Sequence, residues 1–194
     1  MNKDKFQRIH STNPLSLKLA CNVLKNGGII AYPTDTIYGF GCDAKNNKAI
    51  DFLNSIKKRK GPMSVICSSV KKSLTWMKIN EKLKKDAAKK MKKGTTVIIP
   101  IKKNIVSELI TGKDRSLGIR IPEHTFCKEL SIIYNNPITT TSVNRSGSNP
   151  YTNPDKIENE FSNEIDILID DGLIKGSASK IYQLINNKWK VIRL

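Results

Sequence analysis

The stretch at residues 27–44 limits what this chain can fold into more than any other part of the sequence. Four apolar residues at 29–32 lead directly into Pro33, which has no N–H to give to a sheet and therefore ends a strand. Polar side chains and two glycines follow at once: Thr34, Asp35, Thr36, Tyr38, Gly39 and Gly41. These residues alone leave two interpretations open, a polar turn after a strand or a small-ligand site built at the strand end.

Helical and extended patterns alternate along the rest of the chain. Apolar residues at helical spacing predict helices after Asn13-Pro14, through residues 49–56, between residues 70 and 93, through residues 126–133 and at residues 153–161. β-rich runs predict strands at residues 29–32, 64–67, 95–100, 116–122, from 137 onward, and at 165–169, 179–184 and 189–194. No repeat or linker divides the chain. The sequence therefore predicts one α/β or α+β domain over residues 1–194, with a twisted mixed β-sheet flanked by helices.

The formal net charge of +17 has two explanations. Clustered lysines bind phosphates, so a polyanionic partner would account for the excess. A lysine-rich composition spread over a solvated surface would account for it equally well. Only six of the 34 basic residues are arginine, and these are the more informative ones, because a guanidinium offers a planar bidentate fork that lysine lacks.

Cysteine and histidine usage excludes several classes of site. The four cysteines at positions 21, 42, 67 and 127 form no C-x-x-C pair, and the chain has two histidines. This pattern indicates buried thiols in a reducing, cytoplasmic compartment, without a zinc site or a disulfide framework. No apolar run approaches the length of a membrane span, and Met1–Lys5 lack the apolar region of a signal peptide.

Neither of the common nucleotide fingerprints, G-x-x-x-x-G-K-[ST] and G-x-G-x-x-G, occurs in the chain. What remains is a set of cations and polar groups on separate predicted loops: Lys57, Arg59, Arg120, Ser142, Asn144 and Arg193. Such a set suits a triphosphate and a carboxylate better than a general acid–base pair.

Four motifs stand in register across the domain: Y-P-T-D-T-x-Y-G-x-G-C-D-A at 32–44, K-x-R at 57–59, G-I-R-I-P-x-H at 118–124 and T-S-V-N-x-S-G at 141–147. Together they closely resemble the YrdC/TsaC family of L-threonylcarbamoyladenylate synthases, and Ser179 and Ile192-Arg193 also fit. The resemblance implies the short, single-domain type with a concave basic groove. It further implies that L-threonine, bicarbonate or CO2, and ATP give threonylcarbamoyl-AMP and pyrophosphate, with Mg2+ expected on the phosphates. A separate transferase complex would use the product to form threonylcarbamoyladenosine (t6A) in tRNA.

The resemblance also implies residue roles by position. L-threonine would be held by Thr34, Arg120, Thr140 and Ser179. ATP would be held by Lys57, Arg59, Ser116, Ser142, Asn144 and Arg193, with Lys57 and Arg59 as the catalytic cations. These roles agree with the chemistry, because an arginine can take a carboxylate as a bidentate pair and cations can neutralise phosphates during attack on the α-phosphorus.

Two departures from the family pattern affect the predicted site. The usual K-x-R-P-x-x-K-P-L is shorter here by two residues between Arg59 and Pro62, and the usual S-T-[IV]-V-D becomes Ser179-Lys180-Ile181-Tyr182-Gln183. The alternative hypothesis is a non-catalytic module of the same fold that binds tRNA or another RNA through its positive charge. A carbamoyl-transfer domain of hydrogenase maturation enzymes fits less well, because those domains belong to far longer chains.

Overall fold

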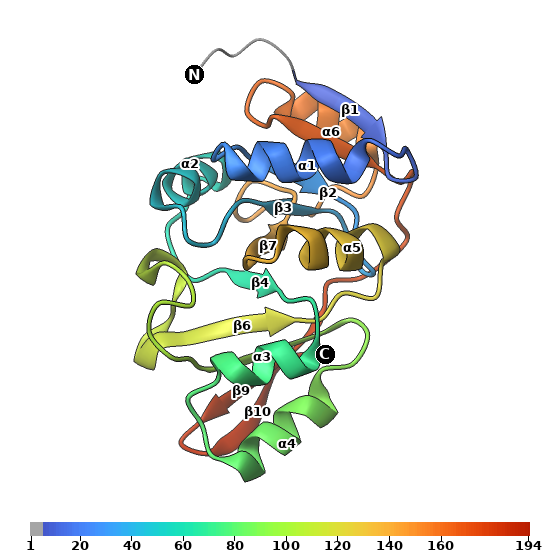
Figure 1. Cartoon of the computed structure of the whole chain (residues 1–194). Coiled ribbons are helices and arrows are strands. Elements are labelled where there is room, and N and C mark those ends of the chain that lie inside the picture. The colour runs from blue at the N-terminus through green and yellow to red at the C-terminus, as the bar shows by residue number, and fades with distance from the viewer. Residues whose placement is uncertain (1–5) are drawn as a thin grey trace.

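The computed structural model describes residues 6–194, in which ten strands form one mixed sheet flanked by helices (Figure 1). The strands are β1 (Gln7–His10), β2 (Ile30–Tyr32), β3 (Gly39–Gly41), β4 (Ser64–Ile66), β5 (Thr95–Pro100), β6 (Ser116–Arg120), β7 (Ile138–Ser142), β8 (Ile167–Asp170), β9 (Lys180–Ile185) and β10 (Lys188–Arg193). The helices are α1 (Ser16–Lys25), α2 (Asn47–Lys57), α3 (Val70–Trp76), α4 (Glu81–Lys90), α5 (Thr125–Tyr134) and α6 (Pro154–Phe161), with short 3-10 turns at Glu108–Ile110 and Lys113–Arg115. The predicted fold class is confirmed.

The sheet order is β1-β8-β2-β3-β7-β4-β6-β5-β9-β10. β8 pairs in parallel with β1 on one side and with β2 on the other. The next pairs, β2 with β3, β3 with β7 and β7 with β4, are antiparallel. The chain therefore crosses the sheet several times, and residues far apart in sequence become neighbours in the centre.

The sequence predicts no signal peptide at Met1–Lys5, and these residues lie outside the described part of the chain. Within 6–194, no helix is long and apolar enough to cross a membrane.

The predicted long helix between residues 70 and 93 is two helices. Side-chain caps start both of them, because Ser69 accepts from the Lys72 N–H and Asn80 accepts from the Leu83 N–H. Between the helices, Met77 forms a bridge with Ile101 at the end of β5. The prediction also missed β1 and β3; two of the three residues of β3 are glycine, which is depleted in strands.

Strand register determines which side chains share a face of the sheet. Thr140 pairs with Ser64 in the centre, and Arg120 pairs with Thr96 further along. These four polar side chains belong to one face. The residues between them, such as Val65, Ile119 and Val97, face the opposite side and belong to the larger hydrophobic core. A second core lies between the sheet and the helices α1 and α5.

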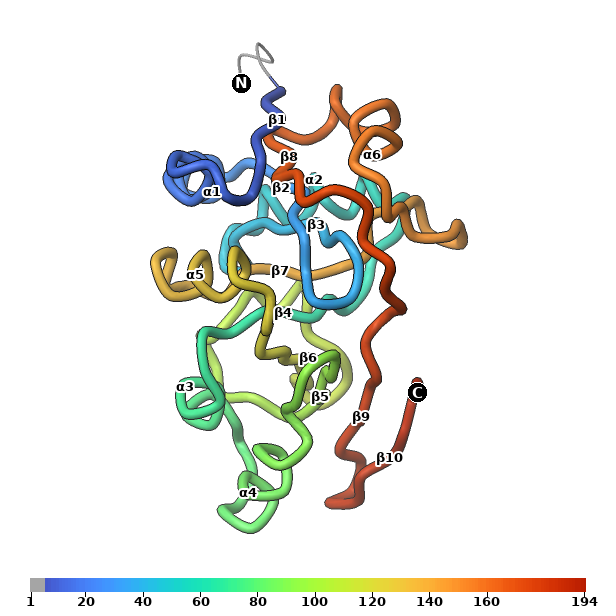
Figure 2. Tube along the Cα trace, turned by 90° about the vertical axis from the view of Figure 1, so that its right-hand side faces the viewer, coloured from blue at the N-terminus to red at the C-terminus, as the bar shows by residue number. Residues whose placement is uncertain are grey.

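The connection from β8 to β9, residues 171–179, runs along the length of the molecule (Figure 2). We call this connection the strap. It crosses the loop that follows β2 so closely that a Cβ atom added to Gly176 would lie 1.7 Å from the carbonyl oxygen of Thr36. Only glycine fits at this crossing, because any side chain would occupy the space of the Thr36 peptide. The strap therefore brings the C-terminal hairpin onto the polar loop that the sequence singled out.

Candidate active site

A cavity of about 270 Å³ lies where the loop after β2, the strap and several strands of the sheet meet. Its lining includes residues from β4, β5, β6, β7 and β9 and the end of β10. The lining residues are Thr34, Thr36, Ile37, Tyr38, Gly39, Arg59, Pro62, Met63, Ser64, Thr96, Arg120, Thr140, Thr141, Ser142, Pro150, Ala178, Ser179, Ile181 and Arg193. The volume is close to the lower limit of small-ligand sites.

Arg120 ends β6 and is 5% exposed. Its Nη2 donates to Asp35 Oδ1 at 2.6 Å and its Nη1 donates to Thr36 Oγ1 at 2.8 Å. The other oxygen of Asp35 accepts the N–H of Gly94 at 3.0 Å. The Nε of Arg120 is buried and has no partner among the described residues. A buried donor without a partner costs free energy unless a ligand or water accepts from it.

The hydroxyls of the loop after β2 form a chain whose proton directions are determined. Thr34 Oγ1 donates its single hydrogen to the carbonyl oxygen of Ile37 at 2.6 Å. The 3.0 Å contact between the two hydroxyls must therefore use the hydrogen of Thr36, which in turn accepts from Arg120. Thr34 Oγ1 also accepts two backbone N–H groups of its own turn. The Thr34 hydroxyl lines the cavity but has no hydrogen left to donate to a ligand.

Lys57, the last residue of α2, is 2% exposed. Its Nζ donates to Ser142 O at 2.6 Å and to Asn144 Oδ1 at 2.7 Å. Burial, with a further contribution from Arg59, lowers the pKa of Lys57 from 10.5 to about 8. Lys58 then turns the chain with a left-handed φ of 52°, and Arg59 reaches the cavity.

The C-terminal hairpin contributes Ser179 and Arg193. The Arg193 Nε donates to Ser179 O at 2.7 Å, and the Ser179 hydroxyl lies 2.9 Å from that of Thr96. Burial lowers the pKa of Arg193, and the positive charge of Arg120 lowers it further. Repulsion between these two guanidinium groups is relieved when an anion lies between or beside them.

Three guanidinium groups, those of Arg59, Arg120 and Arg193, line the cavity. No carboxylate belongs to its lining within the described chain, and the nearby Asp35 is already bonded to Arg120. Residues 6–194 contain no cluster of three or more His, Cys, Asp or Glu side chains that could hold a metal ion. The electrostatics of the site therefore favour an anionic ligand.

Seven of the ten sequence-predicted residues line the cavity: Thr34, Arg59, Arg120, Thr140, Ser142, Ser179 and Arg193. Lys57 and Asn144 lie directly behind it, because Ser142 Oγ donates to the same Asn144 oxygen that Lys57 binds. Ser116 is the outlier. It begins β6 whereas Arg120 ends it, and four strand residues at about 3.3 Å each place the two roughly 13 Å apart.

The sequence assigned no ligand-binding role to Thr36 or Thr96, although Thr36 belongs to the polar stretch at residues 27–44. Thr36 accepts from Arg120, and Thr96 pairs with Arg120 and contacts Ser179. The contact of Thr36 with Arg120 depends on two segments far apart in sequence, which the polar stretch alone does not reveal. Thr96 carries no local signal either, since its position depends on the pairing of β5 with β6 and β9.

The lysines of residues 71–93 do not line this cavity in the described chain. The Nζ of Lys90 lies 4.7 Å from the ring centroid of Tyr182. Tyr182 pairs with Val97, so it faces the side of the sheet opposite Thr96. The lysine-rich helix α4 therefore meets the hairpin on the face that the cavity does not use.

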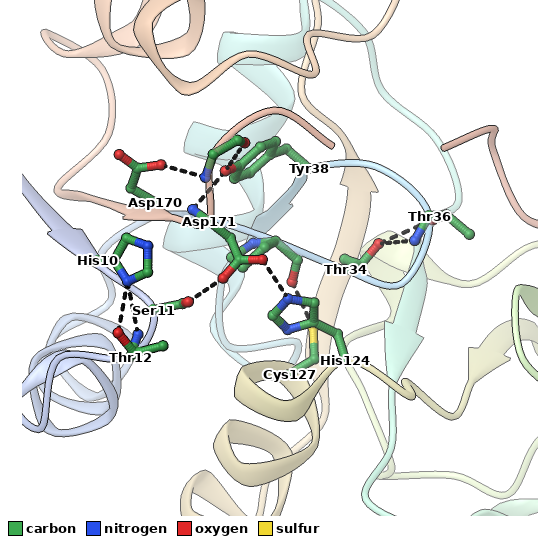
Figure 3. A network of polar contacts seen from close by, with 12 residues as sticks. His10, Ser11, Thr12, Thr34, Thr36, Tyr38, His124, Cys127, Asp170 and Asp171 are labelled. Atoms are coloured by element: carbon green, nitrogen blue, oxygen red, sulfur yellow. Dashed lines mark hydrogen bonds and ion pairs between the residues drawn. The ribbon is translucent and has the colours of Figure 1, made fainter. Parts of the chain in front are cut away.

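A second polar network fixes the start of the strap (Figure 3). Asp171 accepts from Ser11 Oγ and lies 3.1 Å from His124 Nε2. Burial alone would raise the pKa of Asp171, but hydrogen bonds with Ser11 and His124 lower it overall. On the other side, Tyr38 Oη accepts the Asp171 N–H and donates to Gly172 O, each at 2.8 Å. Tyr38 also lines the cavity, so the strap is held at the edge of the site.

Comparisons with known proteins identify chains of similar sequence and fold. A protein of Methanocaldococcus jannaschii described as a candidate threonylcarbamoyl-AMP synthase is 34% identical over 98% of this chain and 93% of its own length. The threonylcarbamoyl-AMP synthase of Photobacterium profundum is 28% identical over 80% of this chain and 86% of its own length. The structure of P. abyssi Sua5 in complex with L-threonine superposes with a TM-score of 0.84 at 24% identity.

That superposition covers 97% of this chain and 55% of the P. abyssi protein, so the chain spans about half the length of that relative. The family model for Sua5, YciO and YrdC proteins, described as telomere recombination, matches residues 22–194. The chain therefore belongs to the Sua5/YciO/YrdC family.

Proposed function

We propose that this protein is an L-threonylcarbamoyladenylate synthase, a nucleotidyltransferase that condenses L-threonine, bicarbonate or CO2, and ATP to threonylcarbamoyl-AMP and pyrophosphate. The observation that carries the proposal is the cavity itself, which is lined by three guanidinium groups. Two of the substrates would bring anionic groups there, the carboxylate of threonine and the triphosphate of ATP. The names of the relatives and the L-threonine in the P. abyssi structure support the same reaction.

Arg120 is the proposed ligand of the threonine carboxylate. Thr36 and Asp35 each hold one N–H of its Nη1 and Nη2, and each of these nitrogens carries a second N–H. The donors that remain can bind a carboxylate as a charge-assisted pair. Thr140 and Ser179 line the same cavity and can bind the amine or the side-chain hydroxyl of threonine.

Lys57, Arg59 and Arg193 are the proposed ligands of ATP, with Ser142 and Asn144 beside them. A carbamate oxygen of the carbamoylated threonine attacks the α-phosphorus, the bond to the β-phosphate oxygen breaks, and pyrophosphate leaves. The arginines would neutralise charge on the phosphates, and Lys57 would supply its third N–H. Alignment and charge stabilisation carry such a reaction without a dedicated general base.

Mg2+ does not find a protein ligand set here. The lining residues offer guanidinium groups and hydroxyls, whereas Mg2+ prefers carboxylates, phosphates and water. Any Mg2+ in the site would therefore enter on the phosphate oxygens of ATP.

We further propose that residues 1–194 act as one domain, because the cavity draws on residues from Thr34 to Arg193. We place the reaction in the cytoplasm, where ATP and tRNA occur, with a separate transferase complex as the consumer of the product.

RNA is proposed as a second partner at the lysine-rich face of α4, away from the cavity. A non-catalytic RNA-binding module would instead show salt-sensitive RNA binding and no turnover.

The test is incubation of the full chain with ATP, L-threonine and bicarbonate, followed by mass spectrometry for threonylcarbamoyl-AMP and an assay of pyrophosphate. We expect pyrophosphate release that requires both threonine and bicarbonate. Release that is indifferent to threonine would overturn the proposal, as would RNA binding without any turnover.

Arg120→Ala tests the role of its side chain. Loss of a charge-assisted hydrogen bond of about 1.5–3 kcal/mol should raise the threonine KM roughly 10–150-fold and leave the ATP KM within about threefold. Arg120→Lys keeps the charge that Asp35 needs and should show a similar threonine effect even if the alanine variant is unstable. Arg115→Ala is the control, since Arg115 pairs with Glu108 on the surface. Equal loss of threonine and ATP affinity would argue against the carboxylate role.

A further inference from the structure

Asp35 is a buried carboxylate whose role the sequence left open. Its side chain is 3% exposed and the Arg120 side chain is 6% exposed, and the two are joined at 2.6 Å. Asp35 does not line the cavity. Both of its oxygens are occupied, one by Arg120 and the other by the Gly94 N–H, which belongs to the turn before β5.

The contacts of Asp35 fix the orientation of the Arg120 guanidinium. A guanidinium has five N–H groups in a rigid plane, so two anchored nitrogens define the direction of the remaining donors. Asp35 anchors Nη2 and Thr36 anchors Nη1, so the second N–H of each of these nitrogens has a fixed direction. The Thr36 anchor is itself held by Thr34 through the hydroxyl chain.

The Gly94 backbone extends this anchoring to the start of β9, directly after the strap. Its N–H binds Asp35, and its carbonyl oxygen accepts the N–H of Lys180 at 2.8 Å. Lys180 follows Ser179, which accepts from Arg193. The Asp35 carboxylate thus binds Arg120 directly. Through the Gly94 backbone it also fixes the segment at residues 179–180, which binds Arg193.

We propose that Asp35 is the positioning residue of the site: it orients Arg120 toward the cavity and thereby sets the affinity for the threonine carboxylate without touching the ligand. This inference rests on the proposed function. Asp35 also supplies the negative charge that permits Arg120 to be buried near Arg193.

The direction in which removal of Asp35 changes the affinity for threonine distinguishes two mechanisms. If Asp35 only competed with the substrate carboxylate for Arg120, its removal would tighten threonine binding. If Asp35 orients Arg120, its removal weakens threonine binding although the site becomes more positive. Asp35→Asn keeps the shape and removes the charge. Its amide must also place an N–H₂ group against either the Gly94 N–H or Arg120, where no acceptor is available.

The experiment measures Asp35→Asn against wild type for L-threonine and ATP, by steady-state pyrophosphate release and by calorimetric binding. We expect the threonine KM and Kd to rise at least tenfold, with the ATP KM within about threefold. Wild type should prefer L-threonine over L-threoninamide as a ligand, because the amide lacks the charge that Arg120 binds. In Asp35→Asn this preference should fall at least fivefold, which a loss of general stability would not cause.

Asp166→Asn is the matched control. Asp166 also follows a turn and accepts a backbone N–H, that of Ile29 at 2.7 Å, and it lies away from the cavity. It should leave both KM values unchanged. If Asp35→Asn is unstable, Thr36→Val tests the second anchor in the same assays and should also reduce the preference for threonine over threoninamide.

Tighter threonine binding in Asp35→Asn, or an unchanged threonine preference in both variants, would overturn the positioning role while wild-type turnover leaves the proposed function intact. A wild-type protein that neither binds threonine nor forms threonylcarbamoyl-AMP would overturn both.

Discussion

Replacing Gly176 by alanine tests whether the strap is seated on the loop after β2. The new Cβ would lie 1.7 Å from the carbonyl oxygen of Thr36 and 2.7 Å from its carbonyl carbon. Comfortable contacts begin near 3.5 Å, so the strap or the loop must move by roughly 1.8 Å. Overpacking of this kind costs about 1–3 kcal/mol.

The energetic cost has a functional counterpart, because the strap carries Ala178 and Ser179 to the cavity wall. A lifted strap would weaken the Lys180 N–H bond to Gly94 and shift the Ser179 carbonyl that holds Arg193. We therefore expect Gly176→Ala to lower substrate affinity about tenfold, which corresponds to about 1.4 kcal/mol.

Thermal unfolding and pyrophosphate release together check this prediction. For a chain of this size, 1–3 kcal/mol corresponds to a fall in Tm of roughly 3–10 °C. Gly172→Ala is the control within the same strap: its φ is +68° and a Cβ there meets nothing within 4 Å. It should cost about 1 kcal/mol in backbone strain and leave substrate affinity unchanged. A Gly176→Ala protein with wild-type Tm and wild-type affinity would refute the close crossing.

Two further predictions concern stability. Because burial lowers the pKa of Lys57 from 10.5 to about 8, the unfolded chain binds more protons than the folded chain between those values. Wild type should therefore gain stability as pH rises from 8 toward 10.5, by up to about 1.4 kcal/mol per unit, and Lys57→Met should lose that increment in urea titrations at pH 7.5 and 9.5. Tyr38→Phe removes bonds to Asp171 N and Gly172 O and should cost about 1–3 kcal/mol in urea unfolding. Tyr151 packs its ring edge-on against Phe161, and Tyr151→Phe should leave the free energy of unfolding nearly unchanged. Equal losses of stability in the two variants would contradict a stabilising role for the Tyr38 hydroxyl.

Local chemistry made much of the architecture predictable. Pro33 ended β2 one residue after Tyr32, and the cap at Asn153 with Pro154 began α6 where expected. The four cysteines are buried free thiols, as their spacing indicated. These features depend on a few neighbouring residues, so a single sequence is sufficient to predict them.

Pairing between distant strands could not be predicted in the same way. Thr96 reaches the cavity because β5 pairs with β6 and β9, and no residue near Thr96 records that pairing. The break between α3 and α4 depends on the bridge from Met77 to Ile101, a contact of the same kind. The positions of the motifs identified more of the cavity-lining residues than hydrophobic periodicity did. They could not show that the hydroxyl of Thr34 already makes its hydrogen bonds within its own turn.

The path of the strap has a consequence for the order of folding. Cavity residues span the chain from Thr34 to Arg193, and the last of them reach it only after β9 has paired with β5. Closing contacts over such sequence separations is slow, so the cavity should be among the last features to form. Substrate would then bind only the finished fold, and the stabilisation it adds, which grows as RT ln(1 + [L]/Kd), would report complete folding more directly than helix content does.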